Sequence, residues 1–312
     1  MIPVLEVGGT HVSAALVDPV SWSVRAATRL ELDADASAEA LIGAFAAAAA
    51  TVAAPDGAVW GCAMPDPFDY ERGIGQFEGV GKFTSLRGVD VGAALRERLR
   101  APVAFLNDAD AFVLGEWAAG SLRAVARCAG ITLGTGVGSG WLVDGVPVDP
   151  GVPPGGRIHR MSIDGRPLED VVSRRAIRRA YAAAGGTAAD EAGQADGVGA
   201  SDGAGEADRA GASDGAGTAD VREIAEAARA GDALSRRVLD GAMSALGRVV
   251  GQCVAAFGPH ALVIGGSMSA SWDLLEPAFR SGAGNGLPPI SVAVDSDRAP
   301  LVGAAVHASR IL

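Results

Sequence analysis

Asn107 and Asp108 stand where an apolar strand is expected to end and a helix to begin, in the segment APVAFLNDADAFVLGEW (Ala101–Trp117). Ligands of α/β proteins collect at the carboxyl ends of the strands. An aspartate there could accept the proton of a sugar hydroxyl that attacks a phosphoryl group, while the asparagine holds a neighbouring hydroxyl. Such general-base assistance is typically worth about 10²–10⁴ in rate. Both residues are also good helix N-caps, so a purely structural role is the alternative.

Three glycine-containing turns each follow an apolar strand, at the start, in the middle and near the end of the chain. They lie in VLEVGGTHVSAALVD, CAGITLGTGVGSGWLVDG and ALVIGGSMSAS, and the first two repeat one hairpin pattern. Glycine lets a ligand approach the backbone because it has no Cβ, and successive amides that point one way bind anions. One such turn usually only reverses the chain, but three together favour a phosphate site. The candidate residues are Gly8, Gly9, Thr10, Gly134, Thr135, Gly136, Gly265 and Gly266.

An alternation of strands and helices should position these residues. Apolar runs predict strands at Val4–Val7, Val12–Val17, Val59–Ala63 and Val103–Leu106. Helical spacing predicts helices at Ala38–Ala54 and Val91–Leu99, the second after the N-cap Asp90. The resulting alternation of strands and helices indicates an α/β domain with a mixed sheet over residues 1–115.

Residues 184–220 differ from the rest of the chain, because nearly all are Ala, Gly, Asp, Glu or Ser and GASDGAG occurs twice. Such a segment buries too little apolar surface to offset the entropy of ordering it. We therefore expect a disordered insertion without chemistry. The flanking segments have apolar residues at helical spacing, so the insertion interrupts a helical region.

Composition argues against nucleic-acid and membrane partners. The formal net charge is −11, which disfavours phosphate backbones and anionic lipid surfaces. There is no signal-peptide pattern and no apolar run of the roughly 18 residues that a membrane helix needs. Cys62, Cys128 and Cys253 lie far apart in apolar contexts, which is typical of buried thiols in a reducing compartment. We expect a cytoplasmic protein.

In this order, the motifs resemble those of the ROK family of sugar kinases (repressor, open reading frame, kinase), within the actin-like ATPase superfamily. FLNDADAFVLGEW is similar to the family's Asn-Asp-Ala-Asn-Ala-x-x-x-Gly-Glu segment, and LVIGGSMSAS and PLVGAA to its adenosine turn and closing segment. The resemblance covers nearly the whole chain apart from the insertion. It implies a two-lobed actin-like ATPase (ribonuclease H-like) fold with mixed sheets flanked by helices, with lobes at residues 1–115 and 116–312. It also implies ATP and Mg²⁺ as cofactors, a hexose substrate and a homodimer.

Position by position, the resemblance implies that Asp108 activates the sugar hydroxyl and that Asn107 is a sugar ligand. Glu169 matches a second sugar carboxylate. His159 lies one residue from the place of a sugar-binding histidine. Glu6 occupies the place of an acidic residue near the Mg²⁺ that accompanies ATP. The glycine turns named above would hold the phosphates and the nucleotide.

The sugar-facing half departs from the family pattern in PPGGRIHRMSIDGRPLEDVVSRRAI. The cysteines of the family's structural zinc site are absent, so no such site is expected. Arg157 stands in place of a glutamate that holds sugar hydroxyls. It could favour a substrate with a carboxylate or phosphate, or pair with an acid such as Asp164 or Glu169. Asp66 and Gly79, in the preceding proline- and glycine-rich loop, are further candidate sugar contacts.

Several functions remain open from the sequence. Glucose or a related hexose is the default acceptor, and an amino-hexose of the kanosamine or N-acetylmannosamine type is the alternative. Because of Arg157, a non-catalytic regulatory protein that binds sugar or ATP is a rival, although the retained Asp108 argues against it. A repressor is not expected, because the first phosphate hairpin begins at residue 4 and leaves no room for a preceding helix-turn-helix domain. An acetate-kinase-like phosphotransferase is disfavoured by the Asn-Asp-Ala segment.

Overall fold

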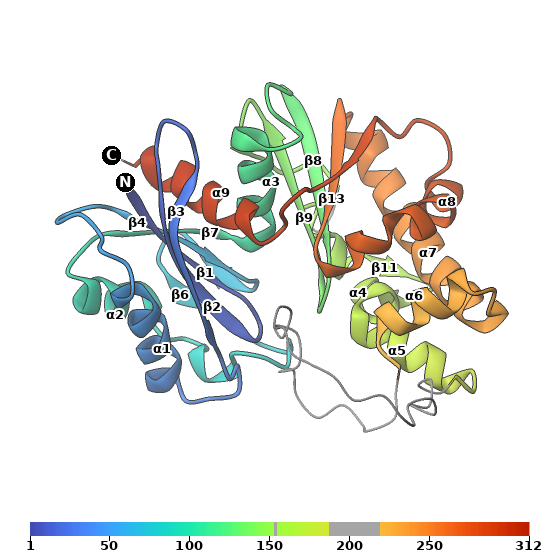
Figure 1. Cartoon of the computed structure of the whole chain (residues 1–312), viewed down its shortest axis with the longest axis horizontal. Coiled ribbons are helices and arrows are strands. Elements are labelled where there is room, and N and C mark those ends of the chain that lie inside the picture. The colour runs from blue at the N-terminus through green and yellow to red at the C-terminus, as the bar shows by residue number, and fades with distance from the viewer. Residues whose placement is uncertain (153–154, 187–218, 312) are drawn as a thin grey trace, which may run out of the picture.

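The computed structural model describes residues 1–152, 155–186 and 219–311. It contains two five-stranded mixed sheets that lie side by side (Figure 1). In the first sheet the strand order is β3-β2-β1-β4-β7. Its strands are β1 (Ile2–Val7), β2 (His11–Val17), β3 (Val24–Glu31), β4 (Trp60–Met64) and β7 (Val103–Asn107). Glu6 of β1 is opposite Ser13 in the antiparallel β2 and beside Ala63 in the parallel β4, which brings the first glycine turn next to the carboxyl ends of β4 and β7.

The second sheet repeats this pattern in the order β10-β9-β8-β13-β14. Its strands are β8 (Arg127–Leu133), β9 (Val137–Val143), β10 (Val146–Pro147), β13 (Ala261–Gly265) and β14 (Ile290–Val292). An antiparallel hairpin, β8–β9, again lies beside a parallel strand, β13. The predicted two-lobed α/β fold with mixed sheets flanked by helices is therefore confirmed.

Two helices, α3 (Asp108–Ala119) and α9 (Arg298–Ser309), lie between the sheets (Figure 1). Their backbones approach so closely at Gly115 of α3 and Gly303 of α9 that a Cβ on either residue would overlap a backbone carbonyl of the other helix. The absence of a side chain at these two positions allows this contact. The expected lobe boundary at residue 115 falls within α3, so the division at that residue stays a prediction.

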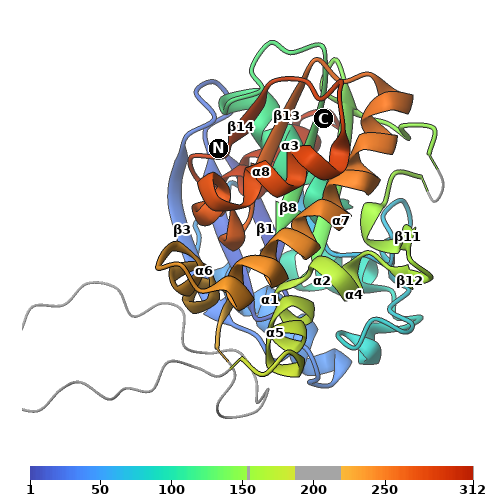
Figure 2. The ribbon, with the colours of Figure 1, turned by 90° about the vertical axis from the view of Figure 1, so that its right-hand side faces the viewer.

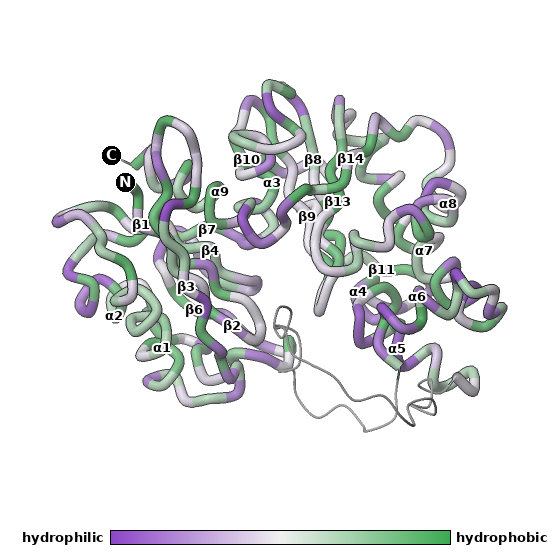
Figure 3. Tube along the Cα trace, viewed as in Figure 1, coloured by the Kyte–Doolittle hydropathy of each residue, from purple (hydrophilic) through white to green (hydrophobic). Residues whose placement is uncertain are grey.

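The remaining helices cover the outer faces of the sheets. On the first sheet these are α1 (Ala38–Ala50) and α2 (Val91–Leu99). The side view in Figure 2 shows the helices of the second lobe in front of β13 and β14. They are α4 (Glu169–Val172), α5 (Arg174–Ala183), α6 (Val221–Arg229), α7 (Ala233–Phe257) and α8 (Trp272–Ala283). Figure 3 shows hydrophobic residues along the strands and hydrophilic residues on many outer loops and helix ends, as expected for cores on both faces of each sheet.

Short elements connect these layers and carry parts of the site. The first lobe contains the hairpin β5 (Phe68–Asp69) and β6 (Ile74–Gly75) and the 3₁₀ turn η1 (Thr84–Leu86), in a segment that the sequence indicated only as a loop. The second lobe contains η2 (Ile158–Arg160), β11 (Ser162–Ile163), β12 (Arg166–Pro167) and η3 (Ser267–Ser271). A buried aromatic cluster around Phe68, Phe77 and Phe83 holds the first-lobe segment in place.

The structure corrects two sequence expectations about local order. The predicted helix Ala38–Ala54 ends at Ala50, because Thr51 turns its hydroxyl and amide back to the Ala48 carbonyl. Most of the expected insertion, residues 187–218, lies outside the described residues. Its last residue, Asp220, is ordered: it forms a capping box with Glu223 at the start of α6.

The three cysteines are buried and free, as predicted. Burial raises the pKa of the Cys128 thiol to about 12 and that of Cys253 to about 11, so both are inert at neutral pH. In the part of the chain that the structure describes, no helix is both long and apolar enough to cross a bilayer.

Candidate active site

A pocket of about 300 Å³ lies between the two lobes, at the carboxyl ends of β7 and β13. Most of the residues that the sequence singled out line it. They are Glu6, Gly9, Asn107, Asp108, Gly134, Thr135, Gly136, His159, Glu169 and Gly266. Gly8, Thr10 and Gly265 belong to the same turns but do not line the pocket, and neither does Gly79. Asp66, the other loop candidate, does.

Asp108 is the first residue of α3 and is only partly exposed to the pocket. Its Oδ1 accepts hydrogen bonds from the Ala109 amide at 2.8 Å and from Asn107 Nδ2 at 3.0 Å. Burial raises the pKa of this carboxyl to about 6, with the nearby Lys82 opposing the rise and Asp66 adding to it. A carboxylate whose pKa is close to neutral, and whose Oδ2 is not engaged by any described residue, is suited to accept a proton.

Asn107 is buried and has two kinds of contact. Its Oδ1 caps α3 by accepting from the amides of Ala109 and Asp110 at 3.1 and 3.2 Å. Its Nδ2 donates to Asp108 and, at 3.1 Å, to the hydroxyl of Tyr70. The capping role that the sequence left open is therefore present. Contact between Asn107 and a sugar stays a proposal.

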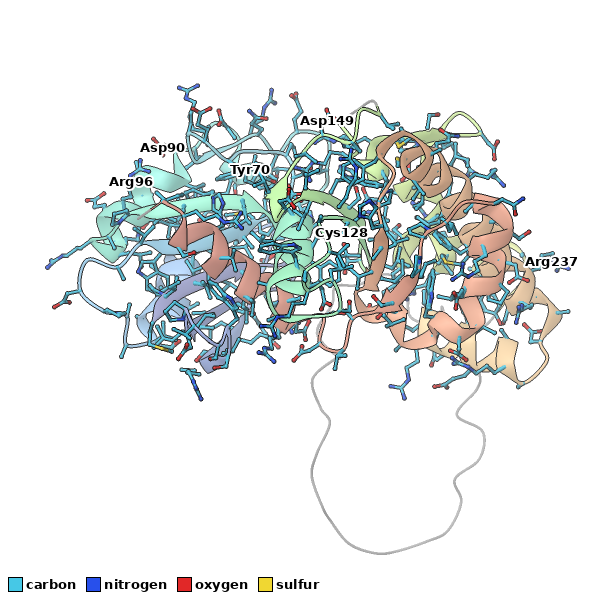
Figure 4. The ribbon with its side chains drawn as sticks, turned by 90° about the horizontal axis from the view of Figure 1, so that it is seen from above. Tyr70, Asp90, Arg96, Cys128, Asp149 and Arg237 are labelled. Atoms are coloured by element: carbon cyan, nitrogen blue, oxygen red, sulfur yellow. The ribbon has the colours of Figure 1, made fainter. Side chains whose placement is uncertain are left out.

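Tyr70 extends this network toward β4. Its hydroxyl lies 2.7 Å from Asp66 Oδ1 and 3.1 Å from the Met64 carbonyl. Burial, with the charges of Asp66 and Asp108 adding to it, raises the pKa of Tyr70, so the hydroxyl keeps its proton. Figure 4 shows Tyr70 on the side of the first lobe that faces the second, whereas Asp90 and Arg96 lie toward its outer end. Tyr70 thus ties the loop after β4 to the residue that precedes Asp108.

Arg157 reaches across from the second lobe into the same network. Of the two alternatives that the sequence left open, the structure shows the pairing with acids, but the partners are Asp110 and Asp66 and not Asp164 or Glu169. Its Nη2 lies 2.9 Å from Asp110 Oδ2 and its Nε lies 3.5 Å from Asp66 Oδ2. Its Nη1 donates to Asn107 Oδ1 at 2.8 Å. Burial alone would lower the pKa of this guanidinium, but the two carboxylates hold it above its usual range.

The partners of Arg157 could not be found from the sequence, because the relative placement of the lobes selects them. Asp164 instead lies 3.4 Å from Arg248 on the surface. Since Arg157 already pairs with Asp66 and Asp110 and donates to Asn107, its guanidinium is engaged by the protein itself. The hypothesis that it receives a carboxylate or phosphate of the substrate is therefore weakened.

His159 and Glu169 come to the pocket from the second lobe, in η2 and at the start of α4. Burial lowers the pKa of His159 to about 4, so its imidazole is neutral at pH 7. Its Nε2 accepts from Arg160 Nε at 3.1 Å, which leaves the proton on Nδ1. Burial raises the pKa of Glu169 above its usual range, against the opposing charge of Lys82. Its carboxylate lies where a Cβ on Gly136 would be.

The glycine turns form a backbone cradle on the far side of the pocket. Gly266 has a φ of +84°, and a Cβ there would overlap the Leu133 carbonyl, so no other residue fits without distortion. The Gly134 amide closes its own turn on the Gly136 carbonyl at 3.0 Å. Around Gly9 a Cβ would meet no atom within 4 Å, which leaves open space for a ligand against the main chain. Glycine turns of this kind can bind phosphates through their backbone, and that role here stays a proposal.

Glu6 lies at the edge of this cradle with 15% of its side chain exposed, and its Oε2 is 3.3 Å from His11 Nε2. A carboxylate beside a phosphate cradle is a suitable ligand for a hard cation bound with ATP. Within residues 1–152, 155–186 and 219–311, no group of three or more His, Cys, Asp and Glu side chains is arranged to hold a metal ion by itself. Glu6 therefore fits Mg²⁺ only together with the phosphates.

Sequence reasoning missed Lys82, Tyr70 and Asp110. Lys82 lines the pocket from the loop before η1. One signal could have identified it, because it is the only lysine in the chain. Tyr70 and Asp110 carried no such signal, since their roles depend on side chains that the fold brings to them.

Comparison with known proteins places this site in a family. The model of the ROK family matches residues 3–151 and 165–311. The chain belongs to the ROK family. Glucokinase of Thermotoga maritima is 29% identical over 226 residues, which cover 69% of this chain but only 65% of that protein. The family assignment agrees with the resemblance that the glycine turns and the Asn-Asp-Ala segment carried.

Solved structures of ROK proteins share the fold over nearly the whole chain. The ROK hexokinase of Thermus thermophilus matches with a TM-score of 0.73 and 22% identity, covering 99% of this chain and 98% of that one. A Streptomyces griseus ROK glucokinase, solved with glucose and AMPPNP, matches with 0.73 and 20%, covering 99% of both. A ROK transcriptional regulator, a homologue of the E. coli MLC protein, matches with 0.71 and 18%, covering 99% of this chain and 77% of that one. The actin-like ATPase fold is thus established, and the fold alone does not separate enzymes from regulators.

Proposed function

We propose that this ROK protein transfers the γ-phosphate of ATP to a hydroxyl of a hexose, with Asp108 as the general base. The observation that carries the proposal is the position of Asp108 across one pocket from the glycine cradle. Asp108 and residues of all three glycine turns line the same space of about 300 Å³. A regulator that only binds sugar has no need for a proton acceptor in this position.

The hydrogen bonds of Asp108 fix how it would act. Oδ1 is held by the Ala109 amide and by Asn107, so the carboxylate cannot rotate freely. Oδ2 is left to accept the proton of the sugar hydroxyl as its oxygen attacks the γ-phosphorus. With a pKa of about 6, the carboxyl is ionised at pH 7 and remains a better base than an exposed aspartate.

The glycine cradle would hold the phosphates through backbone amides, which requires no side-chain rearrangement during transfer. Mg²⁺ bound with ATP would neutralise phosphate charge, and Glu6 is the residue placed to hold it. Closure of the two lobes would exclude water, which otherwise competes with the sugar as acceptor. Phosphoryl transfer depends mainly on such positioning and charge stabilisation.

The charge of the pocket bears on the acceptor. Asp66 and Asp110 already neutralise Arg157, and Asp108, Glu6 and Glu169 add further negative charge. A neutral hexose such as glucose, or an amino-hexose with a protonated amine, suits this lining. An acceptor that carries a carboxylate would be repelled. Glucose remains the first candidate. An amino-hexose is the second, either of the kanosamine type, whose free amine is protonated, or of the N-acetylmannosamine type, whose acetylated nitrogen carries no charge.

The test is ATP- and Mg²⁺-dependent ADP release over a panel of hexoses and amino-hexoses. Asp108→Asn should lose about 10²–10⁴ of kcat with the best sugar. Asp164→Asn is the matched control, because Asp164 is exposed and lies outside the pocket lining. If no sugar is turned over by the wild-type protein although ATP or a sugar binds, the regulatory alternative replaces the kinase proposal.

A further inference from the structure

Lys82 is the only lysine among the 26 lysines and arginines of the chain. All the other positively charged side chains among these 26 residues are arginines. The two residues differ chemically, since an ammonium is a compact, strongly hydrated point charge and a guanidinium is a broad planar fork. The single lysine also lines the pocket between the lobes. Its position therefore suggests a task for which an ammonium is required.

The backbone at Lys82 is held from its C-terminal side. Phe83 is fully buried and has a left-handed φ of +56°. The Phe83 amide donates to the Ala34 carbonyl at 2.9 Å, and its ring centroid lies 5.3 Å from that of Phe77. A bulky residue keeps a positive φ only when its surroundings impose it. Lys82 thus extends into the pocket from a fixed point, and it is itself half-buried.

Lys82 lines the same pocket as carboxylates from both lobes. Its charge opposes the burial that raises the pKa of Asp108 in the first lobe, and it does the same for Glu169 in the second. None of the described carboxylates, however, lies close enough to form an ion pair with it. The side chain therefore lies in the space that the reacting groups would share.

No other cation of the described pocket lining can serve this space. Arg157 is engaged by Asp110, Asp66 and Asn107. His159, the other basic residue of the lining, is neutral at pH 7 because burial lowers its pKa to about 4. The phosphate cradle is thus made of backbone amides and carboxylates, which leaves the charge of a triphosphate incompletely balanced by the protein.

We propose that the Lys82 ammonium binds the γ-phosphoryl group of ATP and stabilises it during transfer. The proposal rests on the proposed kinase function. As the bond from the γ-phosphorus to the β-phosphate oxygen breaks and the bond to the sugar oxygen forms, the sugar proton passes to Asp108 and ADP leaves. Lys82 stays protonated and balances the negative charge on the oxygens of the moving group, as cationic clamps do in other phosphoryl transfers.

Nucleotide affinity tests the contact without requiring turnover. Titration calorimetry with Mg²⁺ would compare ADP and a non-hydrolysable ATP analogue on the wild-type protein, Lys82→Met and Arg87→Met. Lys82→Met should weaken the ATP analogue about tenfold or more and leave ADP within about twofold. Arg87→Met is the matched control, since Arg87 is exposed in the same segment and pairs with Glu78. An unchanged ratio of the two affinities in Lys82→Met would overturn the proposal.

The single lysine also offers a direct probe. Reductive ¹³C-methylation modifies only Lys82 and the N-terminal amine and keeps their charge. The Lys82 signal should shift with the ATP analogue and much less with ADP; equal shifts would contradict a γ-phosphate contact.

If the wild-type protein phosphorylates a sugar, Lys82→Met should lower kcat about 10²-fold, and Lys82→Arg should recover part of it. Absence of turnover in the wild-type protein would refute the kinase function while the affinity ratio still tests Lys82.

Discussion

Asp108→Asn should stabilise the folded protein at pH 8 while it removes catalysis. The substitution keeps the shape of the side chain, and an amide oxygen can still accept from Ala109 and Asn107 as Asp108 Oδ1 does. What it removes is a negative charge that burial makes unfavourable in the folded state. A residue whose replacement costs activity but gains stability serves function at the expense of the fold.

The magnitude follows from the pKa. It rises from 3.8 to about 6 on folding, and each unit is worth about 1.4 kcal/mol. The folded protein binds this proton more tightly than the unfolded chain does, so the ionised carboxylate costs stability. The cost is absent well below pH 3.8, grows as the pH rises from there to about 6, and is complete above that. After allowance for partial exposure to the pocket, we expect a gain of about 2 kcal/mol at pH 8 and under about 1 kcal/mol at pH 4.

Urea unfolding of wild type and Asp108→Asn at pH 8 and pH 4 measures this difference directly. Asp232→Asn is a control of opposite sign, because hydrogen bonds from Ser235 hold the pKa of Asp232 below its usual value. That variant should lose more stability at pH 8 than at pH 4. The reasoning is refuted if Asp108→Asn destabilises the protein at pH 8, or changes its stability equally at both pH values.

Three further predictions follow from local geometry. Gly266→Ala should prevent folding or abolish nucleotide binding, because its Cβ would overlap the Leu133 carbonyl. Gly134→Ala should fold normally and bind ATP more weakly. Thermal unfolding reports the folding of each variant, and calorimetry reports its nucleotide binding. Asp220→Ala should cost about 1 kcal/mol in urea unfolding, since it removes the capping box of α6. Arg157→Met should cost about 3 kcal/mol by leaving two half-buried acids without their cation, and clearly less when Asp110→Asn is present.

The fold could be predicted largely from local patterns. The ends of the four strands that were predicted with bounds fell within two residues of their observed positions, because an apolar run is contiguous in sequence. The glycine turns and Asp108 could be found for the same reason, as each directly follows a strand. The helix α1 was predicted too long, since its alanine-rich end continues the pattern past Thr51, whose hydroxyl bonds back to the chain.

The missed parts depend on contacts between distant segments or on a weak local signal. Tyr70 holds Asn107 from 37 positions away, and no periodicity reports such a pair. Asp220 could have been recognised, because Asp220 and Glu223 have capping-box spacing, but the composition of the preceding residues obscured it. Lys82 required a count over the whole chain, since its neighbours alone only indicate a loop.

Two departures from the family pattern in the sugar-facing half of the pocket, Asp110 and Arg157, are in contact with each other. By the resemblance of its motifs to the family pattern, this chain has Asp110 in place of the second asparagine of Asn-Asp-Ala-Asn-Ala, and Arg157 is interpreted as standing in place of a sugar-binding glutamate. The two unusual residues lie 2.9 Å apart, so each supplies the charge that the other needs. Returning Arg157 alone to glutamate would place a third carboxylate beside Asp110 and Asp66, which is unfavourable in a partly buried site. Arg157 and Asp110 therefore form one charge pair, and we expect that a family-type sugar site can be restored only by replacing both residues together.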